Sequence, residues 1–138
     1  MRHDGAPALG SYDPGRAGSA LGAAALIGAG VLAVSGGVAW HQAFVLLVLA
    51  PLLEESVFRA GVQEWLMRSA ATPFAASLVT ALLFALAHVI ARADWTQIVL
   101  AVPALLIGAV YARTRRLRHC VALHAAMNAL WLLWAVGR

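Results

Sequence analysis

Charged residues and cysteines are scarce in this sequence. Only 12% of the residues are charged, lysine is absent, and the single cysteine, Cys120, excludes an intrachain disulfide. A soluble domain carries charge on about a quarter of its residues, whereas 62% of these residues are hydrophobic and the mean hydropathy is +0.81. This composition excludes soluble globular, disordered, fibrous and disulfide-framework proteins and predicts that the chain lies in a lipid bilayer.

Arginine supplies all of the basic charge, and its distribution argues against nucleic acid as a partner. Ten arginines and six acids give a net charge of +4 and a pI near 10.6. Four of these arginines stand together between two apolar runs, at Arg113, Arg115, Arg116 and Arg118. Basic residues in such a position normally fix the orientation of a membrane protein. We therefore expect no nucleic-acid partner.

Long apolar runs predict an all-α, polytopic integral membrane bundle. Residues 1–18 are polar and are expected to form an N-terminal tail, while residues 19–138 form a single transmembrane domain. A helix needs about 20 apolar residues to cross the hydrocarbon core, and strands would leave unpaired backbone groups in lipid. Five helices are expected: Ala20–Trp40, Ala43–Leu66, Pro73–Ala91, the shorter Gln97–Ala112, and Cys120–Val136.

The arginines also predict the orientation of the bundle. With the N-terminus in the cytoplasm, seven arginines lie inside, only Arg92 and Arg138 face outside, and Arg59 lies within the membrane. This bias follows the positive-inside rule. Most of the tryptophans then lie at the outer interface, as in an aromatic belt, although they also suit core packing. The layout and the small size favour a prokaryotic cytoplasmic membrane.

Six polar residues inside the predicted helices are candidate site residues, because a charge at the bilayer centre costs at least about 2.5–3.5 kcal/mol. They are Glu54, Glu55 and Arg59 in the second helix, His88 in the third, and His124 and Asn128 in the fifth. Glu55 and Arg59 stand four apart, the spacing of an ion pair on one helix face. Glu54 is rotated by about 100° from Glu55, so it can face another helix and act as a base. His124 and Asn128 share a face through the same spacing.

Structural roles compete with chemistry for these residues. Polar side chains in membrane helices form interhelical hydrogen bonds worth about 0.6–2 kcal/mol, and this suits His124 or Asn128, taken singly, as well as catalysis does. A structural ion pair is the favoured interpretation of Glu55 and Arg59. Glu54 is harder to explain by packing, because Arg59 can pair with only one of two adjacent glutamates.

The motifs resemble those of the CPBP family of glutamic intramembrane proteases, which includes CAAX prenyl endopeptidases and Abi-type bacteriocin-processing or self-immunity proteins. Residues 54–59 fit EExxxR, residues 84–88 fit FxxxH, and residues 124–128 fit HxxxN. The resemblance covers about residues 51–133, and the short chain is similar to the JDVT-CTERM-associated members. It implies a helical membrane protease that works without a metal or another cofactor.

By position, the resemblance implies a role for each candidate residue. Glu54 and His88 would hold and activate a water, His124 and Asn128 would stabilise the oxyanion, and Glu55 and Arg59 would support the site. The expected function is an intramembrane endopeptidase that cleaves a membrane-anchored protein or peptide precursor. Its substrate could be a prenylated CAAX-type C-terminus, a bacteriocin precursor or a C-terminal sorting segment, of which the last two are favoured.

Alternatives remain open from the sequence. One glutamate and two histidines are also a ligand set for catalytic zinc, although no HExxH motif is present. A non-catalytic immunity or binding protein of the same fold would not need Glu54 as a base, and a small transporter or proton relay would need its ionisable residues spaced along a path. The predicted helix ends also place Glu54, His88 and His124 at depths that differ by about 8 Å, which argues against a single shared site. Starting the third helix near Ser77 and the fifth near Arg116 would largely remove this difference.

Overall fold

The computed structural model describes residues 27, 28, 30, 31, 35 and 37–138. The predicted polar tail, residues 1–18, lies outside this part of the chain, as does much of the predicted helix Ala20–Trp40. Every element between residues 37 and 138 is a helix, and this part contains no strand. The all-α prediction is confirmed for these residues.

A single unbroken helical run carries the EExxxR motif. It consists of α2 (Trp40–Phe44), η1 (Val45–Leu49), α3 (Ala50–Glu55), η2 (Ser56–Gln63) and α4 (Glu64–Arg68), in agreement with the predicted helix Ala43–Leu66. The segments η1 and η2 are π-helical, with hydrogen bonds from residue i to i+5, and in η1 the Ala50 N–H donates to the Val45 carbonyl. Pro51 has no N–H. The next bond of this register, to the Leu46 carbonyl, therefore cannot form.

The other helices extend beyond their predicted ends. Helix α5 (Pro73–Arg92) begins where the Thr72 hydroxyl accepts the Ala75 N–H. Next, η3 (Trp95–Leu100) and α6 (Ala101–Thr114) form one span of 20 residues, which corrects the shorter prediction of Gln97–Ala112. Helix α7 (Leu117–Val136) begins before Cys120, its predicted start. The predictions ended where polar residues begin, but helical backbone hydrogen bonds continue through such residues.

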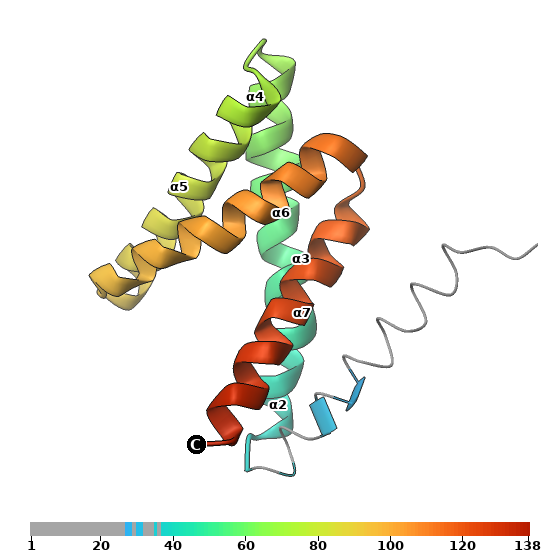
Figure 1. Ribbon diagram of the computed structural model, residues 1–138, viewed down its shortest axis with the longest axis vertical. Helices are drawn as coiled ribbons and strands as arrows, with labels where there is room; N and C mark the ends of the chain where they lie inside the picture. The colour runs from blue at the N-terminus through green and yellow to red at the C-terminus, as the bar shows by residue number, and fades with distance from the viewer. Residues whose placement is uncertain (1–26, 29, 32–34, 36) are drawn as a thin grey trace, which may run out of the picture.

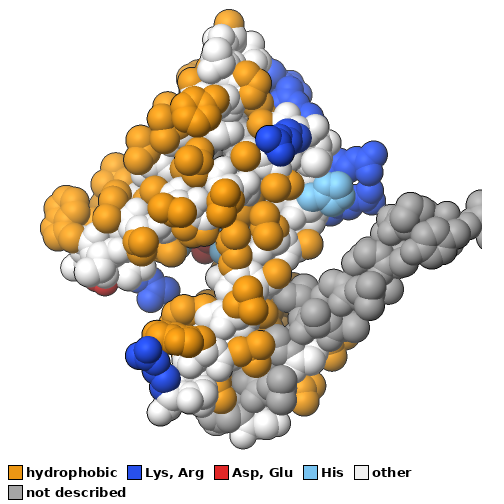
Figure 2. Space-filling view, in the orientation of Figure 1, with side chains coloured by type: hydrophobic (Ala, Val, Ile, Leu, Met, Phe, Trp, Pro, Cys, Tyr) orange, Lys and Arg blue, Asp and Glu red, His pale blue; other side chains and the backbone are white. Residues whose placement is uncertain are grey.

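Within the part of the chain that the structure describes, three helices are long and apolar enough to cross a membrane: Pro73–Arg92, Trp95–Thr114 and Leu117–Val136. Large apolar side chains are also exposed along the molecule, and Figure 2 shows them spread over the visible face. Trp95, Trp40 and Ile90, for example, are each more than 70% exposed. Such a surface requires lipid rather than water around it, so the protein is an integral membrane protein. The count of five spans and the cytoplasmic N-terminus stay predictions.

The helices are arranged around the α2–α4 run, which forms the long axis in Figure 1. Helices α5 and α6 lie side by side against its α4 and η2 end, while α7 crosses α3 and runs towards α2. Arg115 closes the turn between α6 and α7 in the left-handed conformation, with φ of 53°. Its guanidinium donates to the Glu64 carboxylate at 2.7 Å, which ties this turn to α4.

Gly108 allows α6 to approach the buried side of η2. A Cβ atom at this position would lie 3.1 Å from the Ser77 Cβ and 3.3 Å from both the Arg59 Nη1 and the Gln63 Oε1. We expect Gly108→Ala to lower the free energy of unfolding by about 1–3 kcal/mol, as overpacking usually does.

Gly61 is a matched control for this substitution, because it is also helical but exposed, and its Cβ would meet only the Ser56 carbonyl oxygen at 3.7 Å. Gly61→Ala should be neutral or stabilising by about 0.5–1 kcal/mol. Denaturant titration in detergent, followed by tryptophan fluorescence, measures both values. Equal effects of the two substitutions would show that the close approach at Gly108 is unimportant.

Asp94 caps the start of η3, between two spans. Its carboxylate accepts hydrogen bonds from the Gln97 amide at 2.9 Å, the Thr96 hydroxyl at 2.7 Å and the Thr96 N–H at 2.9 Å. These bonds lower the pKa of Asp94 from its ordinary value, and the bond from Gln97 contributes most. Such a carboxylate stabilises the fold above its unfolded-state pKa of about 3.9, and this contribution is lost as the pH falls through the folded-state pKa.

We therefore expect Asp94→Asn to lower the thermal midpoint at pH 7 and to lower it less at an acidic pH below the lowered folded-state pKa of Asp94, where the carboxyl group is protonated in both states. Circular dichroism melting in detergent at the two pH values measures this difference. An equal loss at both would contradict a contribution from the ionised carboxylate.

Candidate active site

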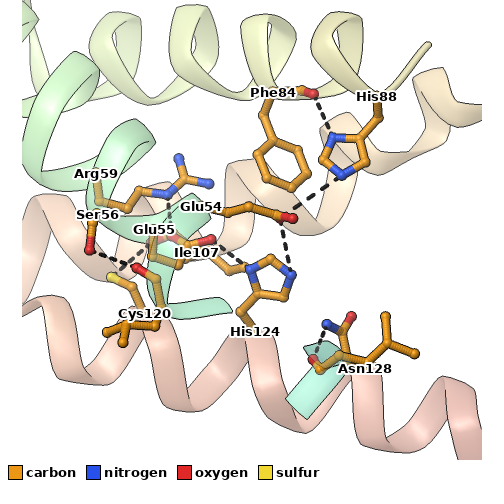
Figure 3. Close-up of polar contacts among 12 residues, drawn as sticks. Glu54, Glu55, Ser56, Arg59, Phe84, His88, Ile107, Cys120, His124 and Asn128 are labelled. Atoms are coloured by element: carbon orange, nitrogen blue, oxygen red, sulfur yellow. Dashed lines mark hydrogen bonds and ion pairs between the residues drawn. The ribbon is translucent and has the colours of Figure 1, made fainter. Parts of the chain in front are cut away.

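The side chains of Glu54, His88 and His124 come together from three helices. The Glu54 Oε2 lies 3.7 Å from the His124 Nε2 and 3.9 Å from the His88 Nε2. Glu54 is at the end of α3, His88 on α5 and His124 on α7 (Figure 3). Their side chains are 29%, 22% and 11% exposed, so the cluster is partly buried and remains accessible from outside the protein. Figure 2 shows acidic and histidine atoms in a recess of the visible face. The depth difference expected from the sequence does not separate the three side chains.

Both imidazoles are held at the nitrogen that points away from Glu54. The His88 Nδ1 lies 2.9 Å from the Phe84 carbonyl oxygen, and the His124 Nδ1 lies 2.8 Å from the Glu55 Oε1. A carbonyl oxygen and an ionised carboxylate can only accept, so each Nδ1 carries the proton and donates. The Nε2 atoms of both rings are thereby directed at Glu54, as Figure 3 shows.

The expected ion pair of Glu55 and Arg59 is present and fully buried. The Arg59 Nε donates to the Glu55 Oε2 at 2.7 Å, and both side chains are 0% exposed. The other oxygen of Glu55 accepts the bond from His124. Glu55 thus links Arg59 to His124, so its two oxygens have different partners. The two adjacent glutamates thus have different environments. Glu55 is buried with both oxygens hydrogen-bonded, whereas Glu54 is partly exposed.

Phe84 fits against both histidines. Its ring centroid lies 4.4 Å from that of His88 at an interplanar angle of 32°, and 6.0 Å from that of His124 in an edge-to-face arrangement. Phe58 packs on it edge to face at 5.0 Å. This aromatic packing restricts the rotation of both imidazoles. The Phe84 residue therefore fixes His88 twice, through its ring and through its carbonyl oxygen.

Asn128 lies one turn beyond His124 on α7, but its carboxamide contacts the backbone of η1. The Asn128 Nδ2 donates to the Leu46 carbonyl at 2.8 Å (Figure 3). This is the carbonyl that Pro51 cannot satisfy in the π-helical register. One Asn128 donor thus replaces a missing backbone bond and joins α7 to η1. A carboxamide nitrogen has a second N–H, which remains for another acceptor.

Gln63 is a polar residue of the site that the motifs did not indicate. It is fully buried, and its Nε2 donates to the Ser77 Oγ at 2.9 Å and to the Gly108 carbonyl at 2.8 Å. Its Oε1 accepts from the Arg59 Nη1 at 3.3 Å. The sequence did hold a signal, because residues 55, 59 and 63 continue one four-residue spacing along a helix face.

The hydroxyl of Ser56 and the thiol of Cys120 contact backbone carbonyls and not Glu54 or the two histidines. The Ser56 hydroxyl donates to the Leu52 carbonyl at 2.6 Å, within its own helical run. Cys120 is fully buried and packs in the core. Among the residues that the structure describes, no group of three or more His, Cys, Asp and Glu side chains is arranged to hold a metal ion.

The structure therefore defines a helical membrane protein in which one carboxylate and two imidazoles from three helices come together. The model of the family described as type II CAAX prenyl endopeptidase Rce1-like matches residues 36–130, more than half of the chain. The protein belongs to this family of membrane proteases. No curated protein and no solved structure matches the chain. The predicted CPBP membership is confirmed, and the family indicates a CAAX-type intramembrane peptidase.

Proposed function

We propose that the protein is an intramembrane endopeptidase that hydrolyses a peptide bond of a membrane-associated protein with a water activated by Glu54. The carrying observation is the spacing at Glu54, whose Oε2 lies 3.7 and 3.9 Å from the two Nε2 atoms. These distances are too long for direct hydrogen bonds and suit a water that bridges the groups. The partial exposure of all three side chains supports access for that water.

The proposed reaction uses Glu54 first as a base and then as an acid. The water oxygen attacks the scissile carbonyl carbon while its proton passes to the Glu54 carboxylate, and His88 holds the water in place. The carbonyl oxygen then bears negative charge. Collapse of this intermediate breaks the C–N bond as Glu54 returns the proton to the leaving nitrogen, which gives a carboxylic acid and an amine.

His124 and Asn128 are assigned to the developing negative charge. Donors fixed before the reaction are commonly the largest catalytic contribution, and both side chains are fixed, one by Glu55 and one by Leu46. The second N–H of Asn128 would face the substrate oxygen. His124 would donate to the same oxygen from Nε2 as an imidazolium with protons on both ring nitrogens, because its Nδ1 proton is already donated to Glu55. Glu55 and Arg59 act by holding His124, so they are positioning residues.

The substrate class follows from the family and from the setting. A site within an apolar bundle suits a peptide that is held at the membrane by its own apolar segment or by a lipid attached to it. Family membership supports a CAAX-type C-terminus, while the small bundle continues to favour a bacteriocin precursor or a C-terminal sorting segment in a prokaryotic membrane. All three substrates share a scissile bond next to a membrane anchor.

A reconstituted cleavage assay tests this proposal. Purified protein in proteoliposomes is offered the three substrate types, with and without a zinc chelator, and products are identified by mass spectrometry. We expect cleavage of at least one substrate and no effect of the chelator. Sensitivity to the chelator, restored by zinc, would favour the metalloprotease alternative. Absence of cleavage from every substrate would favour a non-catalytic binding or immunity protein.

A further inference from the structure

We propose that Gln63 is a positioning residue that sets the orientation of the His124 imidazole through Arg59 and Glu55. This inference rests on the proposed function, because it assigns Gln63 to the same site. Gln63 is a neutral residue outside the three motifs, and it is fully buried in an apolar bundle. A buried carboxamide is costly unless its donors and acceptor are engaged, and here all are.

Gln63 fixes the long helical run against two other helices. Its two donors reach the Ser77 hydroxyl on α5, at 2.9 Å, and the Gly108 carbonyl on α6, at 2.8 Å. With both N–H groups directed there, the Oε1 can point only back along η2, where it accepts from the Arg59 Nη1. The close approach of α6 depends on Gly108, because a Cβ atom at this position would lie 3.3 Å from the Gln63 Oε1.

The guanidinium of Arg59 has few other restraints. Its Nε is bound to Glu55 and its Nη1 to Gln63, while its Nη2 has no hydrogen-bond partner among the residues that the structure describes. A planar guanidinium held at one end alone can rotate out of the Glu55 plane. The bond from Gln63 is the second anchor that prevents this rotation.

The contacts continue from Arg59 to the reacting groups. Glu55 shares one oxygen with Arg59, at 2.7 Å, and the other with the His124 Nδ1, at 2.8 Å. The opposite nitrogen of His124 faces Glu54 at 3.7 Å. Helix α6 carries none of the three motifs, yet through Gln63 it determines where the His124 imidazole points.

The substitution Gln63→Met tests the proposal, because methionine fills a similar volume without a hydrogen bond. We expect the downfield proton signal of the His124 Nδ1–H, assigned by its loss in His124→Gln, to shift or to broaden by exchange in the folded variant. We also expect kcat to fall about ten- to a hundredfold, as small misplacements at a site do, with KM within about twofold of the wild-type value. A role in packing alone would lower the folded fraction and leave the signal in place.

Gln42→Met is the matched control, because Gln42 is exposed on α2, and it should leave the signal and kcat unchanged. If Gln63→Met does not fold, Ser77→Ala replaces it, since this change removes one of the two anchors of Gln63 and should give a smaller effect in the same direction. An unchanged His124 signal in the folded variant would overturn the inference. The signal does not depend on cleavage, so failure of the proposed function, seen as no cleavage by the wild type, is distinguished from failure of the Gln63 role.

Discussion

Glu54→Gln is expected to lower kcat for peptide hydrolysis by about 10²- to 10⁴-fold, the usual contribution of a general acid–base group. The glutamine keeps the size and hydrogen-bonding capacity of the side chain but cannot take the proton of the attacking water. The Glu54 Oε2 lies 3.7 and 3.9 Å from the two Nε2 atoms, which is too far for a direct hydrogen bond, so its replacement breaks no such bond to the imidazoles. We therefore expect the thermal midpoint and KM to change little.

Glu64→Gln provides the control for this experiment. It removes the same charge from the same helical run, where Glu64 accepts from Arg115 at 2.7 Å, Arg68 at 2.9 Å and Tyr111 at 3.1 Å. This variant should lose stability and keep its kcat per folded molecule. Initial rates with the substrate found in the reconstituted assay measure both variants, normalised to folded protein. Undiminished cleavage by Glu54→Gln would refute its role as the base.

Apolar runs were sufficient to predict the helices that the structure describes from Ala43 onwards, because a helix in lipid must be apolar over most of its length. The predicted end of Ala20–Trp40 was wrong, since Trp40 begins α2. The predicted Ala43–Leu66 and Pro73–Ala91 agree with the structure to within a few residues. The α6 and α7 predictions were too short at polar ends such as Arg118 and His119, where the backbone continues to bond helically. Neither π-helical segment was predicted, since a change from i+4 to i+5 bonding has no clear signature in side-chain type.

Spacing along one helix predicted the contacts within that helix but few of the contacts between helices. The Glu55–Arg59 pair followed directly from its four-residue spacing. That His124 would bind Glu55 on one side and face Glu54 on the other depends on how α7 crosses α3, which no single-helix pattern contains. The expected depth difference of about 8 Å assumed parallel helices starting at one level, whereas Figure 1 shows α7 crossing α3 obliquely.

The contact of Asn128 could have been suspected by considering two residues of the sequence together, Pro51 and Asn128. Pro51 removes a backbone donor from the middle of a membrane helix, and an orphaned carbonyl in lipid needs a replacement. Asn128 provides it at the Leu46 carbonyl. Predicting this bond requires both the π-helical register and the position of α7, so the residue could be named a candidate but its partner could not.

Arg59→Met is expected to lower the free energy of unfolding by about 3–5 kcal/mol, because it leaves Glu55 charged and buried without its counter-ion. Both side chains are 0% exposed, so water cannot replace the lost partner. The Gln63 Oε1 loses its donor as well. Denaturant titration in detergent, followed by tryptophan fluorescence, measures the change.

The double variant Glu55→Gln/Arg59→Met separates the cost of an orphaned charge from the cost of lost packing. Removing both charges should restore most of the lost free energy, since replacing a buried ion pair by neutral groups of similar volume is often nearly neutral. Such a protein would be folded but slow, because His124 would then be held by a neutral amide instead of the Glu55 carboxylate. If the double variant were no more stable than Arg59→Met, the pair would be stabilising through packing, and the burial of Glu55 would not depend on charge compensation by Arg59. A stable double variant with wild-type kcat would instead show that the buried pair serves the fold alone and that His124 needs no carboxylate behind it.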